Sequence, residues 1–379
     1  MTKQMRRHLI LILVFWTAQS LLFGSISVSP SLFELKIPPG KTFTDSIRVV
    51  NVTDTTTDIV VYLSDFRLSE EGKIRFFDAG TTEYSLKDHI RVNPTSFTLE
   101  PGEEKWVRFS LRMPAGQMGE AQGIIFFQTE PRNVKSPAGR RVLVAARIGS
   151  TVYAAMKPTI NVSADIINLL FRRGQDPGTL EYAAIVHNNG NMHIRPKGKL
   201  TLLDASGKKI VMPDINEKTS SILRDSVRLF EGVLTGSFPE GVYRAVLELD
   251  VGKEAQEVEK TVRLAPATGI VDMSVSYEKN TTLGVTFKPG GMKTAPLDPK
   301  SFFRLRTLLG AQVVRKPLTE CLNLKAGAKL QESSSFQCAL EAPLRPGVYI
   351  AEILLFDSGD ESEADSRPVA TYQKLEVKE

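Results

Sequence analysis

Few residues in this sequence are spaced for metal or catalytic chemistry. His187 and His193 flank residues 188–192, whose sequence is NNGNM. Two imidazoles brought together by a turn could share a metal ion if a third ligand joined them. Asn and Gly also form tight turns without any metal, because both accept positive φ angles. We therefore interpret the stretch as a turn and predict no metal site.

Two other polar groupings are equally weak as sites. Residues 357–365, DSGDESEAD, lack the ordered ligand spacing of an EF-hand loop and are interpreted as a hydrated hairpin tip. His89 follows Asp88, but neighbours in sequence are not an acid–base pair in space. The chain contains neither G-x-S-x-G nor H-E-x-x-H. We predict no catalytic residues, no cofactor and a protein that is not an enzyme.

The N-terminus has the composition of a secretory signal peptide. Lys3, Arg6 and Arg7 precede the apolar run LILILVFW at residues 9–16, and small residues follow. We predict that residues 1–24 are a signal peptide cleaved after Ser20 or Gly24, with an uncleaved anchor as the alternative. The later apolar runs fall short of the roughly 20 residues that span a bilayer. The mature chain is expected to be periplasmic or secreted and not inserted in the membrane.

Charge and cysteine content fit an exported protein. The formal net charge of +5 includes three cations of the leader, so the mature chain is nearly balanced. Basic blocks interleaved with aromatic residues are absent, and we predict no nucleic-acid partner. Cys321 and Cys338 form an even pair, which in an oxidising compartment predicts a disulfide. Two buried free thiols are the alternative.

Internal repeats and turn spacing predict the elements that would position any site. FPEGVYRAVLELDVG at residues 238–252 and LRPGVYIAEILLFDSG at 344–359 share Gly-Val-Tyr and an alternating apolar pattern. Each would form, with the alternating segment after it, a hairpin that ends a unit of about 100 residues, a usual size for a β-sandwich. We predict an all-β chain of tandem immunoglobulin-like β-sandwich domains: residues 25–158, 159–266 and 267–379.

Residues 92–114 predict a two-faced hairpin in the first of these domains. Val107, Phe109, Leu111 and Met113 alternate with Arg108, Ser110 and Arg112, which places the apolar row on one face. Pro101-Gly102 supplies the turn. We expect the apolar row to face inward. Trp106 falls on the outward face, where it either packs against a neighbouring strand or domain or belongs to a contact patch.

Several segments of residues 26–158 resemble the first domain of the periplasmic pilus-chaperone, or PapD-like, superfamily. They are VSPSLFEL, PPGK, IRVVNVT, the hairpin of residues 92–114, GIIFFQTEP and VLVAARIGSTVYAAM, in that order. The segments after residue 160 are similar to generic bacterial Ig-like modules. The resemblance implies a sandwich that lends an edge strand to an exported subunit.

The resemblance also implies where a partner would bind. Family members grip a subunit's carboxylate with an Arg on the first strand and a Lys on the last strand. Here those positions hold Leu32 or Glu34, and Ser150, while Arg147 is a nearby cation. A lent strand would place four side chains of equal parity, Val142, Val144, Ile148 and Val152, in a partner's groove. The alternative is that this row belongs to the domain's own core.

The sequence therefore predicts a non-catalytic protein-binding protein whose partner is an exported subunit or an envelope protein. A chaperone-like or assembly role for a pilus-type or surface structure is the first hypothesis. The alternative is a structural or adhesin-like Ig scaffold of the cell envelope without chaperone activity. Both readings use the same three-module array.

Overall fold

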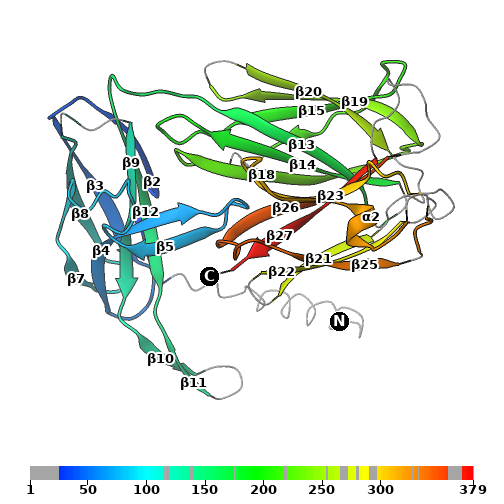
Figure 1. The fold of residues 1–379 in the computed structure, drawn as a ribbon. Helices are drawn as coiled ribbons and strands as arrows, with labels where there is room; N and C mark the ends of the chain where they lie inside the picture. The colour runs from blue at the N-terminus through cyan, green and yellow to red at the C-terminus, as the bar shows by residue number, and fades with distance from the viewer. Residues whose placement is uncertain are drawn as a thin grey trace, which may run out of the picture. The chain divides into compact units, whose positions relative to one another are not determined.

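Strands account for nearly all the regular structure of the described residues (Figure 1). The computed structural model describes residues 25–114, 116, 119–135, 140–174, 176, 178–216, 220–252, 255–264, 272–278, 281–289, 297–325, 328–331, 333–356 and 369–378. The predicted signal peptide and the acidic stretch 357–365 lie outside these residues. The fold class is all-β, with tandem immunoglobulin-like sandwiches, as the sequence predicts.

Contacts divide the chain into two units, which are described separately. The first unit comprises Met1–Phe66, Phe76–Gln117 and Ala121–Pro158. The second unit comprises Arg67–Arg75, Met118–Glu120 and Thr159–Glu379. The predicted boundary between residues 266 and 267 lies outside the described residues, so the division of the second unit into two domains stays a prediction.

The first unit is a sandwich of two sheets. One sheet has the order β1-β3-β8-β6, and the other has the order β2-β12-β9-β4-β5, with β7 paired to β4. A separate two-stranded ribbon is formed by β10 and β11. The strands are β1 (Ile26–Ser29), β2 (Leu32–Ile37), β3 (Thr42–Asn51), β4 (Thr57–Leu68), β5 (Ile74–Asp78), β6 (Ile90–Asn93), β7 (Ser96–Leu99), β8 (Glu104–Arg112), β9 (Glu120–Thr129), β10 (Arg132–Lys135), β11 (Arg141–Val144) and β12 (Arg147–Met156).

The core of the first unit is built from alternating residues of facing strands. Val107, Phe109 and Leu111 of β8, with Met113 just after it, are fully buried, which confirms the inward row predicted for this strand. The hairpin predicted for residues 92–114 is wrong, because β7, which precedes the Pro101-Gly102 turn, pairs with β4 of the other sheet, and β6 is the strand that pairs with β8. The Phe109 ring lies 4.9 Å from the Phe33 ring in an edge-to-face contact. Apolar side chains from both sheets therefore meet in one layer, as sandwich packing requires.

The second unit contains two further pairs of sheets. The first pair is β13-β14-β18 with β16-β15-β19-β20, and β17 also pairs with β15. The second pair is β21-β22-β25 with β24-β23-β26-β27. The elements are β13 (Asp165–Arg173), β14 (Thr179–Asn188), β15 (Lys197–Leu203), β16 (Lys209–Val211), β17 (Asp214–Ile215), β18 (Ser226–Thr235), β19 (Gly241–Asp250), β20 (Ala255–Leu264), β21 (Asp272–Glu278), β22 (Thr282–Lys288), β23 (Phe302–Thr307), β24 (Gln312–Pro317), α2 (Leu318–Cys321), β25 (Ser334–Ala339), β26 (Gly347–Leu355) and β27 (Val369–Val377).

Each sheet pair of the second unit has its own apolar core, and a third cluster joins them. That cluster includes Leu170, Ile185 and Leu229 from one pair and Ile350 and Tyr372 from the other. Arg172 adds a bridge, because it donates to the carbonyl of Tyr372 at 2.9 Å and to the side-chain oxygen of Gln373 at 2.8 Å. Apolar contact and hydrogen bonds together make this a single packed unit.

The two Gly-Val-Tyr repeats occupy equivalent positions. Gly241 begins β19 and Gly347 begins β26. The hydroxyl of Tyr243 donates to the carbonyl of Pro239 at 2.9 Å, and that of Tyr349 donates to the carbonyl of Arg345 at 3.0 Å. A tyrosine that closes back onto the chain four residues earlier fixes the entry into its strand, as in the tyrosine corner of Ig-like domains. The repeat seen in the sequence is thus a repeat in structure.

The predicted disulfide is wrong. Cys321 in α2 and Cys338 in β25 are both free thiols. Cys338 belongs to the apolar core, and Cys321 packs against it. Burial raises the pKa of the Cys321 thiol to about 11 and also raises that of Cys338. A thiol must lose its proton before it can attack to form a disulfide, and burial disfavours the resulting thiolate. An oxidising compartment favours disulfides in general, but it does not determine how these two thiols pack.

Candidate protein-binding site

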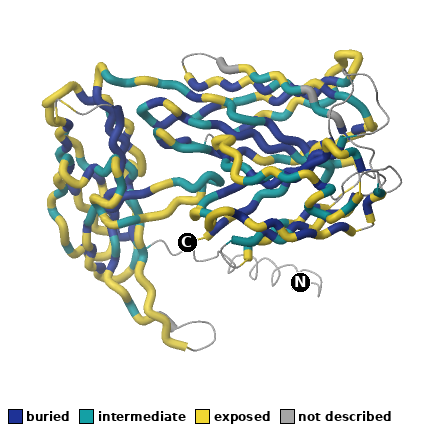
Figure 2. Tube along the Cα trace, in the orientation of Figure 1, coloured by how far each residue is buried: buried dark blue, intermediate teal, exposed yellow. Residues whose placement is uncertain are grey.

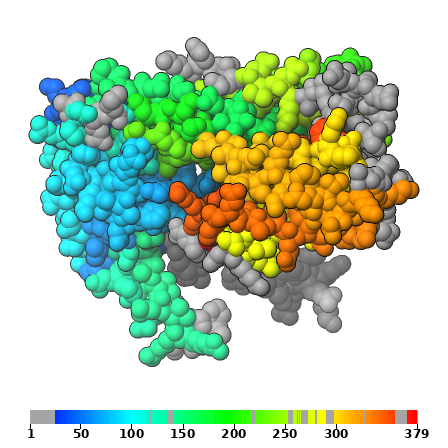
Figure 3. Space-filling view, viewed as in Figure 1, coloured from blue at the N-terminus to red at the C-terminus, as the bar shows by residue number. Residues whose placement is uncertain are grey.

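The β10–β11 ribbon is the most exposed apolar segment of the first unit. Val142, Leu143 and Val144 of β11 are 46%, 63% and 49% exposed. Figure 2 shows β11 exposed along its length, and Figure 3 shows the ribbon extending away from the body of the first unit. Val142 pairs with Val134 and Val144 with Arg132, so β11 has one strand neighbour among the described residues. Its other edge therefore presents backbone groups and apolar side chains together.

The next strand, β12, is divided between an unpaired and a paired part. Thr151–Met156 runs parallel to Leu32–Ile37 of β2 in continuous register. Among the described residues, no strand pairs with Arg147 to Ser150 on the side of β12 that faces β2. Val152 lies in the paired part and is fully buried in the core, whereas Ile148 is half-buried against it.

The predicted site residues therefore separate into three environments. Val142 and Val144 are exposed on β11, Arg147 and Ile148 lie on the unpaired start of β12, and Val152 is a core residue. The sequence suggested one continuous strand with all four apolar residues on one face. A break at Ala145 and Ala146 interrupts it, where the Ala146 amide donates to the Thr129 hydroxyl at 3.0 Å. Residues with the same spacing on the two sides of this break therefore do not share one environment.

Arg147 is held over an aromatic surface. Its guanidinium carbon lies 4.4 Å from the Phe126 ring centroid and 5.0 Å from that of Phe76. One guanidinium nitrogen also approaches the Tyr62 hydroxyl at 3.5 Å. A guanidinium stacked on rings keeps its planar N–H edge oriented while its charge stays accessible. These aromatic residues were not singled out from the sequence, because β4, β5 and β9 bring them together only in the folded sheet.

The other residues at positions implied by the resemblance take part in hydrogen bonding or strand pairing within the first unit. The Ser150 hydroxyl is buried and donates to the carbonyl of Pro30 at 2.8 Å. Leu32 and Glu34 pair in register with Thr151 and Tyr153. The residues at the family's Arg and Lys positions therefore provide no pair of cations here. Arg147 is the cation at the start of β12, where the strand is not paired with β2.

The NNGNM stretch is a turn held by one buried amide. The Asn188 side chain donates to the carbonyls of Met192 at 2.8 Å and of Ile222 and Leu223, both at 3.0 Å. His193 is buried, and its Nδ1 lies 2.8 Å from a carboxylate oxygen of Glu120. Among the described residues, no three His, Cys, Asp or Glu side chains are grouped to hold a metal ion.

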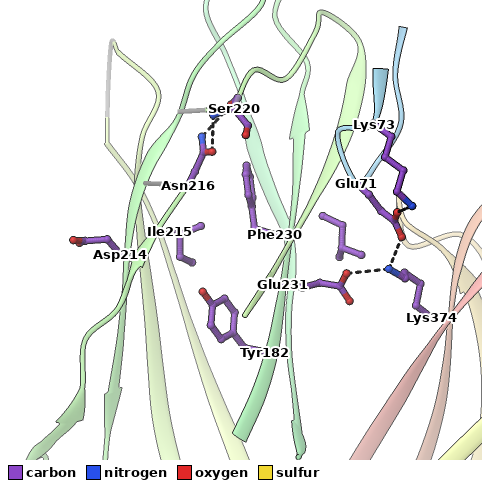
Figure 4. A pocket seen from close by; sticks show the side chains of 11 residues that line it. Glu71, Lys73, Tyr182, Asp214, Ile215, Asn216, Ser220, Phe230, Glu231 and Lys374 are labelled. Carbon is purple, nitrogen blue, oxygen red and sulfur yellow. Dashed lines mark hydrogen bonds and ion pairs between the residues drawn. The ribbon is translucent and has the colours of Figure 1, made fainter. Parts of the chain in front are cut away.

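A pocket of about 660 Å³ opens in the second unit (Figure 4). Lys374 hydrogen bonds to Glu71 and lies 3.0 Å from Glu231, while Lys73 lies 2.5 Å from Glu71. The hydrogen bond from Lys374 is the main cause of the lowered pKa of Glu71. These four charges compensate one another beside an apolar wall formed by Tyr182, Ile215, Leu229 and Phe230.

Asn216 and Ser220, on the other side of the pocket, are already hydrogen bonded within the protein. The Asn216 amide donates to the carbonyls of Pro196 at 2.7 Å and Ser220 at 3.0 Å, and its oxygen accepts the Ser220 amide at 2.8 Å. Asp214 extends away from the other side chains in Figure 4. Because the cations and carboxylates facing each other are paired, we assign no acid–base role to this pocket.

Comparison with known proteins places these features in context. No protein-family model matches the chain, and no curated protein matches it. Solved structures do match: the class 5 fimbriae chaperone CfaA is 15% identical with a TM-score of 0.36, and the chain aligns over 62% of its own length and 98% of that protein. The E. coli chaperone DraB is 16% identical with a TM-score of 0.29 over 62% and 97%.

The Pseudomonas aeruginosa CupB2 chaperone gives a similar result, with 10% identity, a TM-score of 0.26 and coverage of 62% and 99%. Each of these likenesses concerns the fold alone. The described part of the chain has no helix long and apolar enough to cross a bilayer.

Proposed function

We propose that this chain is a non-catalytic, exported protein-binding protein that acts by lending the β11 edge to an incomplete sheet of an exported subunit. The carrying observation is the exposed apolar row Val142, Leu143 and Val144 on a strand with one neighbour among the described residues. Natural proteins protect such edges, because an exposed, apolar edge strand recruits other strands. An edge left uncovered is therefore a binding feature.

The chemistry of the edge supports strand addition. In this mode backbone hydrogen bonds supply affinity, and alternating side chains fill pockets of the partner. Val142 and Val144 share a face of β11, and the unpaired start of β12 continues the edge toward Ile148. Arg147, stacked on Phe126, can donate to a partner carboxylate beside that edge.

A capture experiment tests this proposal with a matched control. The tagged protein and its Val142→Asp/Val144→Asp variant are incubated with an envelope extract of the native organism, and retained proteins are identified by mass spectrometry. Buried apolar pockets reject carboxylates, so the variant is expected to lose a subunit that the unmodified protein retains stoichiometrically. A Val52→Asp/Val60→Asp variant, altered at two other exposed valines, is expected to retain it.

Hydrogen exchange then locates the contact. Backbone amides of residues 141–148 are expected to gain protection in the purified complex. Equal capture by the β11 variant, or protection elsewhere only, would contradict strand lending. Recovery of only large envelope proteins, or of none, would favour a structural or adhesin-like scaffold instead.

A further inference from the structure

The outer face of the sheet β1-β3-β8-β6 carries an unexplained row of residues. On β8 the side chains of Trp106, Arg108, Ser110 and Arg112 alternate with the buried row and face away from the core. Trp106 is 58% exposed. The stretch from Trp106 to Arg112 extends about 20 Å at ~3.3 Å per residue. A large aromatic ring left in water among arginines is not a packing requirement of the sandwich.

Cross-strand neighbours extend this row into a basic surface. Arg48 of β3 lies opposite Trp106, and Arg91 of β6 lies opposite Ser110. The outward positions of the four strands thus hold four arginines and one carboxylate, that of Glu104. The other outward residues are Ser27, Ser29, Thr42, Thr44, Ser46, Val50 and Asn93. We call this surface the Trp106 face.

Two of the arginines are already engaged, and two are not. Arg48 pairs with Glu104, its Nε donating at 2.7 Å. Arg91 donates to the backbone carbonyl of Ile90 at 3.0 Å. Arg108 and Arg112 are exposed and have no side-chain hydrogen bond or ion pair with the described residues. The free guanidinium groups therefore lie on the same strand face as the exposed indole.

We propose that the Trp106 face docks a carboxylate-rich segment of a partner protein. Trp and Arg are the residue types that dominate binding energy at protein interfaces. A guanidinium binds a carboxylate through two parallel hydrogen bonds, and the excess of cations selects an acidic partner. Docking on a lipid surface would need several apolar side chains, and this face offers Trp106 with the smaller Val50. The proposal is independent of strand lending by β11.

The experiment uses Trp106 as its own reporter. The sequence has two tryptophans, and Trp16 lies in the predicted signal peptide, so a Trp16→Phe full-length chain has Trp106 as its sole tryptophan whether or not the leader is cleaved. Poly-L-glutamate is the probe, titrated at low salt and again at about 0.15 M, where the Debye length is about 8 Å. We expect saturable binding that shifts the indole emission to shorter wavelength and weakens with salt.

Charge-reversal variants then decide whether the face is specific. In the same background, Arg108→Glu/Arg112→Glu is expected to weaken binding at least about tenfold, equivalent to about 1.4 kcal/mol. Lys197→Glu/Lys199→Glu makes the same change in net charge at two exposed lysines of β15 and is expected to change affinity by less than about twofold. Trp106→Ala is expected to weaken binding as well. Because this variant lacks the fluorescent reporter, its binding is measured by calorimetry.

Three outcomes would overturn the proposal. The first is the absence of saturable poly-L-glutamate binding. The second is equal weakening by the two charge-reversal pairs, which would assign the attraction to net charge. The third is binding of heparin, but not of poly-L-glutamate, with the same dependence on Arg108 and Arg112, which would make the partner a sulfated glycan.

Discussion

β8 and β11 both carry apolar residues at every second position, and their surroundings are opposite. Val107, Phe109 and Leu111 on β8 are fully buried between two sheets. Val142 and Val144 on β11 are about as apolar, yet β11 belongs to a two-stranded ribbon and both valines are exposed. Alternation alone is therefore ambiguous, because it records a two-faced strand without saying whether the apolar face has a cover.

The presence or absence of a covering sheet distinguishes an apolar row that stabilises the fold from one that can bind a partner. An apolar row with a covering sheet stabilises the fold, whereas one without a cover remains available to another chain. The contrast predicts that equivalent truncations have unequal effects on stability in the two strands. It also predicts that burial governs the behaviour of charged side chains elsewhere in the molecule.

Truncation in the β8 row is expected to have the largest effect. Phe109→Ala removes a ring that contacts Phe33 and Phe43 in the first unit's core. The lost transfer energy and the cavity should lower the free energy of unfolding by about 3–5 kcal/mol. Urea denaturation of the variant beside Leu143→Ala, an exposed truncation on β11, measures this directly. Equal losses in the two variants would remove the distinction between the strands.

A buried charge should give an intermediate, pH-dependent effect. Lys260 donates to the side-chain oxygen of Asn168 at 3.1 Å and to the carbonyl of Leu169 at 2.6 Å. Burial lowers the pKa of Lys260 to about 8. Between about pH 8 and the ordinary value of 10.5, the unfolded chain binds more protons than the folded chain. The free energy of unfolding therefore rises with pH across that interval.

Comparison with Lys260→Met isolates this contribution. The stability of the unmodified protein relative to Lys260→Met should increase by on the order of 1–3 kcal/mol from about pH 8 to above pH 10. Urea denaturation at several pH values gives the difference, and Lys199→Met serves as the exposed control. A constant difference across the interval would show that Lys260 keeps an ordinary pKa.

Much of the fold was predictable from local sequence. The turn at Pro101-Gly102, the inward row of β8 and the Gly-Val-Tyr strands all follow from period-two alternation and turn composition, and the structure confirms them. The free thiols of Cys321 and Cys338 were not predictable, because two cysteines form a disulfide only when the fold brings them into the required geometry.

The surroundings of the candidate site were not predictable from the sequence, and the site itself stays a prediction. The sequence pointed to residues 142–152, but the break at Ala145 and Ala146 depends on a contact with Thr129 from another strand. The burial of Val152 depends on the packing of its sheet against the sheet that contains β8. Both are long-range contacts, and a periodic pattern within one segment contains no information on them.

The smallest expected effect is also the sharpest test of the comparison. Val144→Ala should change the free energy of unfolding by less than about 0.5 kcal/mol, because its side chain is about half exposed on the ribbon. Val152→Ala, eight residues later and of the same parity, should cost about 2 kcal/mol, since two methyl-sized groups leave a closed core.

Urea denaturation of this matched pair uses one amino-acid change in two environments. Two equally destabilised variants would mean that β11 is covered in solution by part of its own chain, and the edge would then be unavailable to a partner. A tolerated Val144→Ala combined with a costly Val152→Ala would leave β11 with an apolar row that the fold does not need. In that case, the role of Val142 and Val144 has to be sought in binding.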